Sequence, residues 1–114
     1  SLVRGMDVLS RVCHEAVDLH RQGRWKEAEQ LYDRILSQAP NDPDTVHLRG
    51  LVALEQGRFD EASGYFTRCV TRHSRPAMVW THLGKSHLHA GRITQARQAL
   101  TKAVELDANA GEAH

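Results

Sequence analysis

The sequence carries almost no net charge. Its 15 Lys and Arg residues nearly balance its 14 Asp and Glu residues, which leaves a formal net charge of +1. A chain without a net field does not attract nucleic acid, an anionic membrane or an acidic substrate from a distance. Apolar runs long enough to span a bilayer are missing as well. We therefore expect neither a nucleic-acid partner nor a membrane partner.

Cysteines are also scarce. The two that are present, Cys13 and Cys69, lie far apart in the sequence and form no CxxC pair. This pattern indicates a reducing compartment rather than a disulfide framework, so we expect a cytoplasmic protein. The length of 114 residues is that of a single domain.

Motifs of catalysis and metal binding are absent too. The sequence has no GxSxG, no GxGxxG, no glycine-rich phosphate loop and no paired-carboxylate arrangement. Eight histidines invite a metal hypothesis, but His82, His87 and His89 are five and two residues apart, not the three or four of a helical zinc site. We predict no catalytic residues, no metal and no cofactor, so this chain is not expected to be an enzyme.

What the sequence does have is an internal repeat. Gly23, Gly57 and Gly91 are spaced by 34 residues, and an arginine follows each of them. The same interval relates small residues and large apolar residues: Ala16, Gly50 and Gly84; Ala28, Ala62 and Ala96; Trp25, Phe59 and Ile93; Tyr32, Phe66 and Leu100. Self-similarity at this period is typical of stacked helical hairpins. The alignment predicts repeats at 9–42, 43–76 and 77–110.

Each repeat contains two apolar stripes of helical period, divided by the Gly-Arg pair. The stripes predict first helices at about 8–22, 43–56 and 77–90 and second helices at about 25–38, 59–72 and 93–106. Asn41-Asp42-Pro43 offers a capping side chain and a proline for the first helical turn, and Ser74-Arg75-Pro76 is expected to act similarly.

The small residues are expected to let the two helices of a hairpin approach closely. The large residues beside them should then fill a shared core. The residues predicted to form that core are Trp25, Tyr32, Phe59, Phe66, Ile93 and Leu100. Cys69 falls in the same register as Ile35 and Ala103, so we predict an inert buried thiol.

This pattern resembles the tetratricopeptide repeat family over residues 9–110. Repeat three carries the signature best, with Trp80, Leu83, Gly84, Gly91 and Ala96, and Pro40 supplies the closing proline of repeat one. Glu15 and Arg49 stand where the family has leucine. The resemblance implies an all-α fold, a right-handed α-solenoid of three antiparallel helix-turn-helix hairpins. Residues 1–8 would be an N-terminal extension, and residues 111–114, with Asn109 as the cap, would open a possible fourth repeat.

The resemblance also implies a concave groove lined by the first helices, in which a protein or peptide binds. The residues that match the family's groove positions are Cys13, Val17, His20, Asp44, His47, Leu51, Leu54, Met78, Thr81, His82, Lys85, Leu88 and His89. The family's carboxylate clamp is absent, because its positions hold Cys13, Val17, Leu48, Met78 and His82. The asparagine ladder of another subgroup is missing as well, because its positions hold His14, Leu48 and His82.

The sequence therefore favours a protein-interaction module that binds a peptide or helical segment. An alternative is that these repeats recruit a substrate or partner for a larger enzyme, a transferase or a hydroxylase. RNA binding, as in the related pentatricopeptide arrays, is disfavoured by the near-neutral charge. Self-association is a further hypothesis, because Ile93, Leu100 and Val104 are expected at the outer surface of the last hairpin. Groove histidines also suggest pH-sensitive binding.

Overall fold

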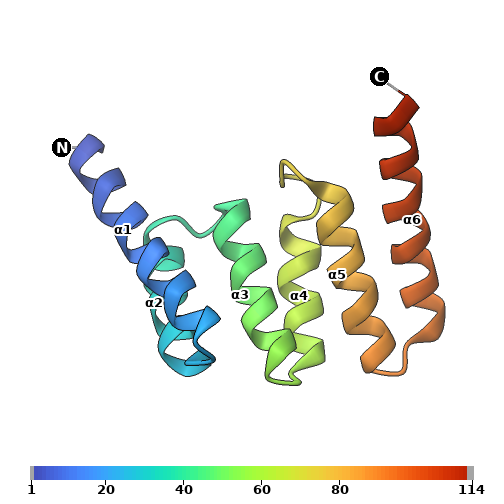
Figure 1. Ribbon diagram of the computed structural model, residues 1–114, viewed down its shortest axis with the longest axis horizontal. Coiled ribbons are helices and arrows are strands. Elements are labelled where there is room, and N and C mark those ends of the chain that lie inside the picture. Colours follow the sequence, from blue (N-terminus) through green and yellow to red (C-terminus); the bar gives the residue numbers. More distant parts are fainter. Residues whose placement is uncertain (1, 113–114) are drawn as a thin grey trace.

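The computed structural model describes residues 2–112 and contains six helices within that range. The helices are α1 (Leu2–Arg21), α2 (Trp25–Gln38), α3 (Pro43–Glu55), α4 (Phe59–Cys69), α5 (Pro76–His89) and α6 (Ile93–Glu112). They stand side by side in chain order, each antiparallel to the next, from α1 at one end to α6 at the other (Figure 1). We call α1–α2 hairpin one, α3–α4 hairpin two and α5–α6 hairpin three.

The Gly-Arg pairs form the turns within the three hairpins. Gly23, Gly57 and Gly91 have φ angles of 76°, 78° and 83°, in the left-handed region that glycine adopts without strain. The arginine after each glycine donates its backbone N–H to a carbonyl five residues earlier, as in Arg24 to Leu19 at 2.9 Å. This is the bonding of a Schellman motif, which satisfies the last carbonyls of the first helix. The 34-residue sequence repeat is therefore a repeat of helix stop signals.

Of the two segments predicted to start helices between hairpins, one is confirmed in full and the other only in its proline, since Pro43 and Pro76 both lie in the first helical turn. Asp42 precedes α3 and accepts a hydrogen bond from the Thr45 backbone N–H at 3.1 Å. Arg75 precedes α5, where no side chain of the Ser74-Arg75-Pro76 segment caps the helix. Instead, the ring Nδ1 of His73 accepts the Arg75 backbone N–H at 2.9 Å.

The core consists of two clusters: one is formed by hairpin one together with Val52 of α3, and the other is shared by hairpins two and three. Tyr32 and Phe66 are fully buried, as predicted. Trp25 and Ile93 are not core residues, since 37% and 54% of their surfaces are exposed. Both are the first residue of a helix, next to the turn, where the neighbouring helix covers only one side of them.

The predicted close approach of helices is also present. A Cβ atom added to Gly50 would lie 2.6 Å from the Phe66 ring, and one added to Gly84 would lie 2.6 Å from Leu100 Cγ. Only glycine fits at these contacts, so the small positions of the repeat set the distance between the two helices of a hairpin.

The outer helices differ from the prediction. Helix α1 begins at Leu2 rather than near residue 8, so most of the expected N-terminal extension is helical. Helix α6 continues without a break through Asn109 to Glu112. The expected cap at Asn109 is therefore wrong, and residues 111 and 112 belong to α6; residues 113 and 114 lie outside the described part. None of the helices described is both long enough and apolar enough to cross a membrane.

Candidate functional site

A depression lies between α1 and α3, where hairpin one meets hairpin two. Its volume is about 460 Å³, and its walls mix apolar and charged side chains. The lining residues are Val17, His20, Arg21, Gly23, Trp25, Leu48 and Glu55. Two of the predicted groove residues, Val17 and His20, thus meet here. Trp25, expected in the core, contributes its exposed side to the same surface.

His20 is held in one orientation at this depression. Its Nε2 lies 2.9 Å from a carboxylate oxygen of Glu55, and its Nδ1 lies 3.1 Å from the hydroxyl of Tyr32. A carboxylate only accepts, so Nε2 donates to Glu55, and Nδ1 of the neutral ring accepts from Tyr32. Burial raises the pKa of the Tyr32 hydroxyl, which keeps it protonated and able to donate. His20 therefore fastens α1 to α3 and fixes the polar side of the depression.

Three histidines gather on the other side of α3, at the joint with hairpin three. His47 Nε2 lies 2.9 Å from His82 Nδ1, and the two rings stack with centroids 5.0 Å apart. His73 meets the His47 ring edge-on, also with centroids 5.0 Å apart, and its Nε2 lies 3.2 Å from Asp44. His47 is only 5% exposed. The sequence placed it in the groove lining, but here it is a packing residue, because the ring of His82 covers it.

The remaining groove residues do not share one surface. Met78 and Thr81 line a depression with Leu106 and Asp107 of α6, not with α3. Leu88 lies in another depression along α6. Lys85 and His89 are exposed, and His89 stacks on Phe59 with centroids 5.2 Å apart.

On α1 and α3, the other predicted groove residues are partly or fully accessible to solvent. Cys13, Leu51 and Leu54 are half-buried, and Asp44 is exposed. Leu51 and Leu54 pack against the core cluster of hairpins two and three. Their contribution to a ligand surface stays a prediction.

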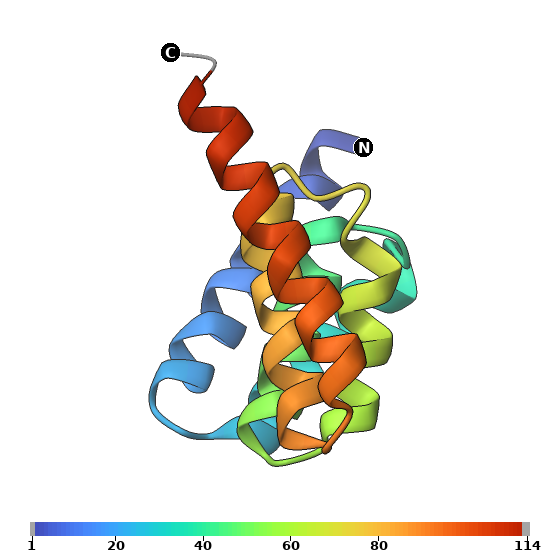
Figure 2. The same ribbon diagram turned by 90° about the vertical axis from the view of Figure 1, so that its right-hand side faces the viewer.

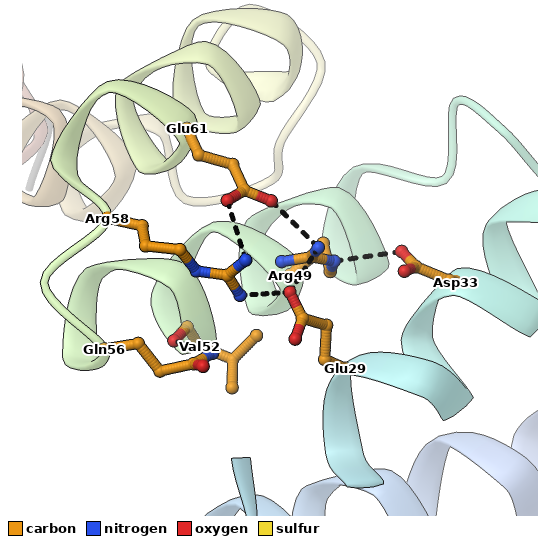
Figure 3. A network of polar contacts seen from close by, with 7 residues as sticks. All are labelled: Glu29, Asp33, Arg49, Val52, Gln56, Arg58 and Glu61. Carbon is orange, nitrogen blue, oxygen red and sulfur yellow. Dashed lines mark hydrogen bonds and ion pairs between the residues drawn. The ribbon is translucent and has the colours of Figure 1, made fainter. Parts of the chain in front are cut away.

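Arg49 is the polar residue that sequence reasoning missed. It stands where the family has leucine, and only 6% of its side chain is exposed. Its guanidinium binds Asp33 and Glu61 at 2.9 Å each and also pairs with Glu29, so it joins α2, α3 and α4 (Figure 3). Burial opposes its charge, but the hydrogen bond and charge of Asp33 more than compensate and raise the pKa of Arg49. A charged residue at an apolar repeat position was the sequence signal for this network.

Two arginines of the Gly-Arg pairs form similar polar contacts between neighbouring hairpins. Arg58 reaches back to Glu29 of hairpin one, and Arg92 reaches back to Asp60 and Ser63 of hairpin two. Glu29 and Ser63 are equivalent positions, 34 residues apart. In hairpins two and three, the repeated arginine therefore links its hairpin to the preceding one, whereas Arg24 pairs with Glu27 of its own hairpin.

The thiols and histidines do not form a reactive centre in residues 2–112. Cys69 is buried, and burial raises the pKa of its thiol to about 11, as expected of an inert core residue. Burial also raises the pKa of Cys13. Within the described range, no three His, Cys, Asp or Glu side chains are placed to hold a metal ion.

Two overlapping comparisons with protein families agree on one assignment. A tetratricopeptide repeat model matches residues 10–75, and a second tetratricopeptide repeat model matches residues 47–111. This chain belongs to the tetratricopeptide repeat family. The six stacked helices are accordingly a tetratricopeptide solenoid, and the departures at Glu15 and Arg49 are variations within that family.

Known relatives of this repeat domain are diverse. "Essential for maintenance of the cell wall protein 1" of Saccharomyces cerevisiae is 30% identical over 73 residues, which are 64% of this chain and 8% of that protein. Among solved structures, MamA (AMB-1) has a TM-score of 0.82 and 22% identity, over 96% of this chain and 64% of its own. The Yersinia enterocolitica type III secretion chaperone SycD, in complex with a peptide of the translocator YopD, has a TM-score of 0.85 and 19% identity, over 90% and 79%. The chain thus spans only a small part of its yeast relative.

Proposed function

We propose that this tetratricopeptide domain is a protein-interaction module that holds a peptide segment in the depression between α1 and α3. The observation that carries the proposal is the composition of that depression. Val17, Leu48 and the exposed side of Trp25 offer apolar contact, while Arg21 and Glu55 offer charges of both signs. Such a surface suits a short segment with an apolar anchor and polar flanks. SycD, a structural neighbour, holds a YopD peptide.

The carboxylate clamp of other family members bears on which ligand this domain prefers. The clamp positions hold Cys13, Val17, Leu48, Met78 and His82, and none of these residues is a lysine, an arginine or an asparagine. We therefore propose that recognition does not depend on a C-terminal carboxylate. Amidation of a bound peptide's C-terminus should leave its affinity unchanged.

A phage-displayed peptide library, panned against the domain, tests this function. Peptides selected by the wild-type domain should bind the Trp25→Ala and Val17→Gln variants at least about tenfold more weakly, because exposed aromatic anchors supply much of the binding energy. Gln30→Arg, at an exposed position of α2 outside the depression, is the matched control and should bind normally. Selected peptides that bind all variants equally would place the site elsewhere, and failure to select any peptide would count against the function.

Self-association through hairpin three is a second proposal. Leu88, Ile93 and Val104 are 50%, 54% and 68% exposed along one depression beside α6. In the part of the chain described, no helix packs on this side of α6, which Figure 2 shows facing the viewer. Arg97 and Glu105 lie in the same depression, one turn before and one turn after Thr101. A twofold axis at Thr101 would pair each Arg97 with Glu105 of a second copy.

Light scattering over a wide range of protein concentration tests the second proposal. A dimer should form and should be lost in Val104→Glu, which puts a charge at the centre of the apolar surface. Swapping the charges in Arg97→Glu with Glu105→Arg should restore the dimer that either single change weakens. A monomer at every concentration would refute it.

A place within a larger enzyme and a cytoplasmic location also stay proposals. Two unpaired cysteines support a reducing compartment. Recruitment of a substrate or partner for a transferase or hydroxylase would use the same depression. Activity of the whole protein should then fall in the Trp25→Ala variant at low substrate concentration and recover at saturation.

A further inference from the structure

The joint between hairpins two and three contains three histidines from three different segments. His47 comes from α3, His73 from the turn between α4 and α5, and His82 from α5. His47 and His73 are 5% and 8% exposed, and His82 is partly buried. Phe66 of α4 forms the floor, with its ring centroid 5.7 Å from that of His47 and 5.8 Å from that of His82. The rings are thus a continuation of the apolar core.

The hydrogen bond between His47 and His82 limits how many protons the pair of rings can hold. Between His47 Nε2 and His82 Nδ1, 2.9 Å apart, one nitrogen must donate and the other must accept. A second proton on the acceptor ring would turn the bond into a contact between two donors. The bond therefore excludes a second proton from the pair, and burial of the two rings opposes the first.

His73 is also restricted. Its Nδ1 accepts the backbone N–H of Arg75, which leaves the ring proton on Nε2, facing Asp44. This bond orders the backbone that leads into α5.

Charged groups around the cluster act in the same direction, with one exception. His82, His73 and Arg75 face His47 from α5 and the turn before it, and Lys85 lies near His82 on α5. Burial and these positive neighbours lower the pKa of His47 to about 3, and burial and Lys85 lower the pKa of His82. Asp44 of α3 is the one carboxylate in contact, and it pairs with His73.

We propose that the joint between hairpins two and three is a pH-sensitive element, in which uncharged His47 and His82 hold α3 against α5 and mildly acidic pH loosens that contact. The unfolded chain takes up protons near pH 6.5, whereas the packed rings do not. Stability is therefore complete above about pH 6.5 and is lost as the pH falls below it.

Urea unfolding without any ligand tests the joint. Trp25→Phe leaves Trp80, which packs on the core cluster of hairpins two and three, as the only tryptophan and fluorescent reporter. Between pH 7.5 and 5.5, each excluded proton raises the unfolding constant about tenfold, so the two rings together raise it by up to about 100-fold. Few carboxylates titrate in this range. EDTA in every buffer keeps trace metal from the rings.

A variant that cannot titrate separates the cluster from other histidines. In His47→Gln with His82→Asn, the amide groups replace the Nε2 and Nδ1 atoms that bond in the wild type, so the contact persists without a proton to exclude. We expect its unfolding constant to change less than about tenfold over the same range; His87, whose pKa is also lowered by burial, supplies the remainder. His14→Gln, at an exposed position of α1, should keep the full wild-type response.

Two results would overturn the proposal. One is a wild-type unfolding constant that is the same at pH 7.5 and 5.5. The other is a double variant with the full wild-type response. Should the double variant not fold, an NMR titration of the wild-type histidine ring protons decides: His47 and His82 must stay neutral at pH 5.5. Because no ligand takes part, a failure of peptide binding would not affect these measurements.

Discussion

Glycine at position 50 sets how closely α3 approaches α4. Its absent side chain leaves room for the Phe66 ring, which would otherwise lie 2.6 Å from a Cβ atom. Phe66 is fully buried and cannot move aside without displacing the rest of the cluster. The same residue supports the His47 and His82 rings. One small position therefore controls both the hairpin and the histidine joint above it.

Gly50→Ala should destabilise the domain by about 1–3 kcal/mol, because the added methyl group overpacks the contact with Phe66. The matched control is Gly64→Ala in α4, where an added Cβ has no atom within 4 Å. That change should be neutral or stabilising by up to about 1 kcal/mol, since alanine is the better helix former. Urea denaturation measures both. Equal effects of the two substitutions would show that helix propensity, rather than close packing, decides stability at position 50.

At the scale of the element, turns and a capping side chain define where the first helices of the hairpins start or stop. The Gly-Arg turns end the first helices through Schellman bonds, and Asp42 starts α3 through its side chain. Asp42 also accepts a hydrogen bond from the Thr45 hydroxyl at 2.6 Å, so both polar groups of Thr45 are satisfied. The two hydrogen bonds fix where the chain turns from hairpin one into hairpin two.

Asp42→Ala should cost about 1 kcal/mol of folding free energy, because the Thr45 N–H and hydroxyl lose their common acceptor. Asn41→Ala is the control. Asn41 is exposed and adjacent, and its substitution should change the stability by less than about 0.5 kcal/mol. Thermal or urea unfolding by circular dichroism gives both values. If Asn41→Ala were the more harmful change, the cap would be assigned to the wrong residue.

At the scale of the whole molecule, ion pairs and hydrogen bonds connect one hairpin to the next. Arg49 and Arg58 bind carboxylates of hairpin one, and Arg92 binds Asp60 of hairpin two. In a solenoid each hairpin touches only its neighbours, so these contacts decide whether the stack unfolds as one unit. His20 and Glu55 add a further link between α1 and α3. The histidine joint is the corresponding link between α3 and α5, and it has no carboxylate partner for His47.

Arg49→Leu, which restores the family's residue, should destabilise the domain by about 1–3 kcal/mol. Its removal leaves Glu29, Asp33 and Glu61 close together without the buried cation that they share. Glu15→Leu makes the same change at the equivalent, exposed position of repeat one and should be nearly neutral. Urea unfolding of the two variants is the measurement. A gain in stability from Arg49→Leu would mean that desolvation of the network outweighs its ion pairs.

Several features could be predicted from the sequence because they depend on short-range chemistry. The six helices, the Gly-Arg turns, the Asp42 cap and the burial of Tyr32, Phe66 and Cys69 all follow from a local pattern repeated three times. Helical period, a left-handed glycine and a capping side chain act within a few residues of one another. A 34-residue spacing then implies that equivalent residues occupy equivalent places.

Tertiary structure alone decided what happens where unlike residues of neighbouring hairpins meet. Arg49 looked like a weakened family position, but carboxylates from two other helices make it the centre of a network. His47 belonged to the predicted groove, yet the ring of His82 stacks on it, while Val17 and Met78 of the same predicted groove line different depressions. Repeat spacing gives each residue its place within a hairpin. Which residue of the next hairpin it contacts depends on how the hairpins stack. That contact decides whether a side chain is buried, charged or open to a ligand.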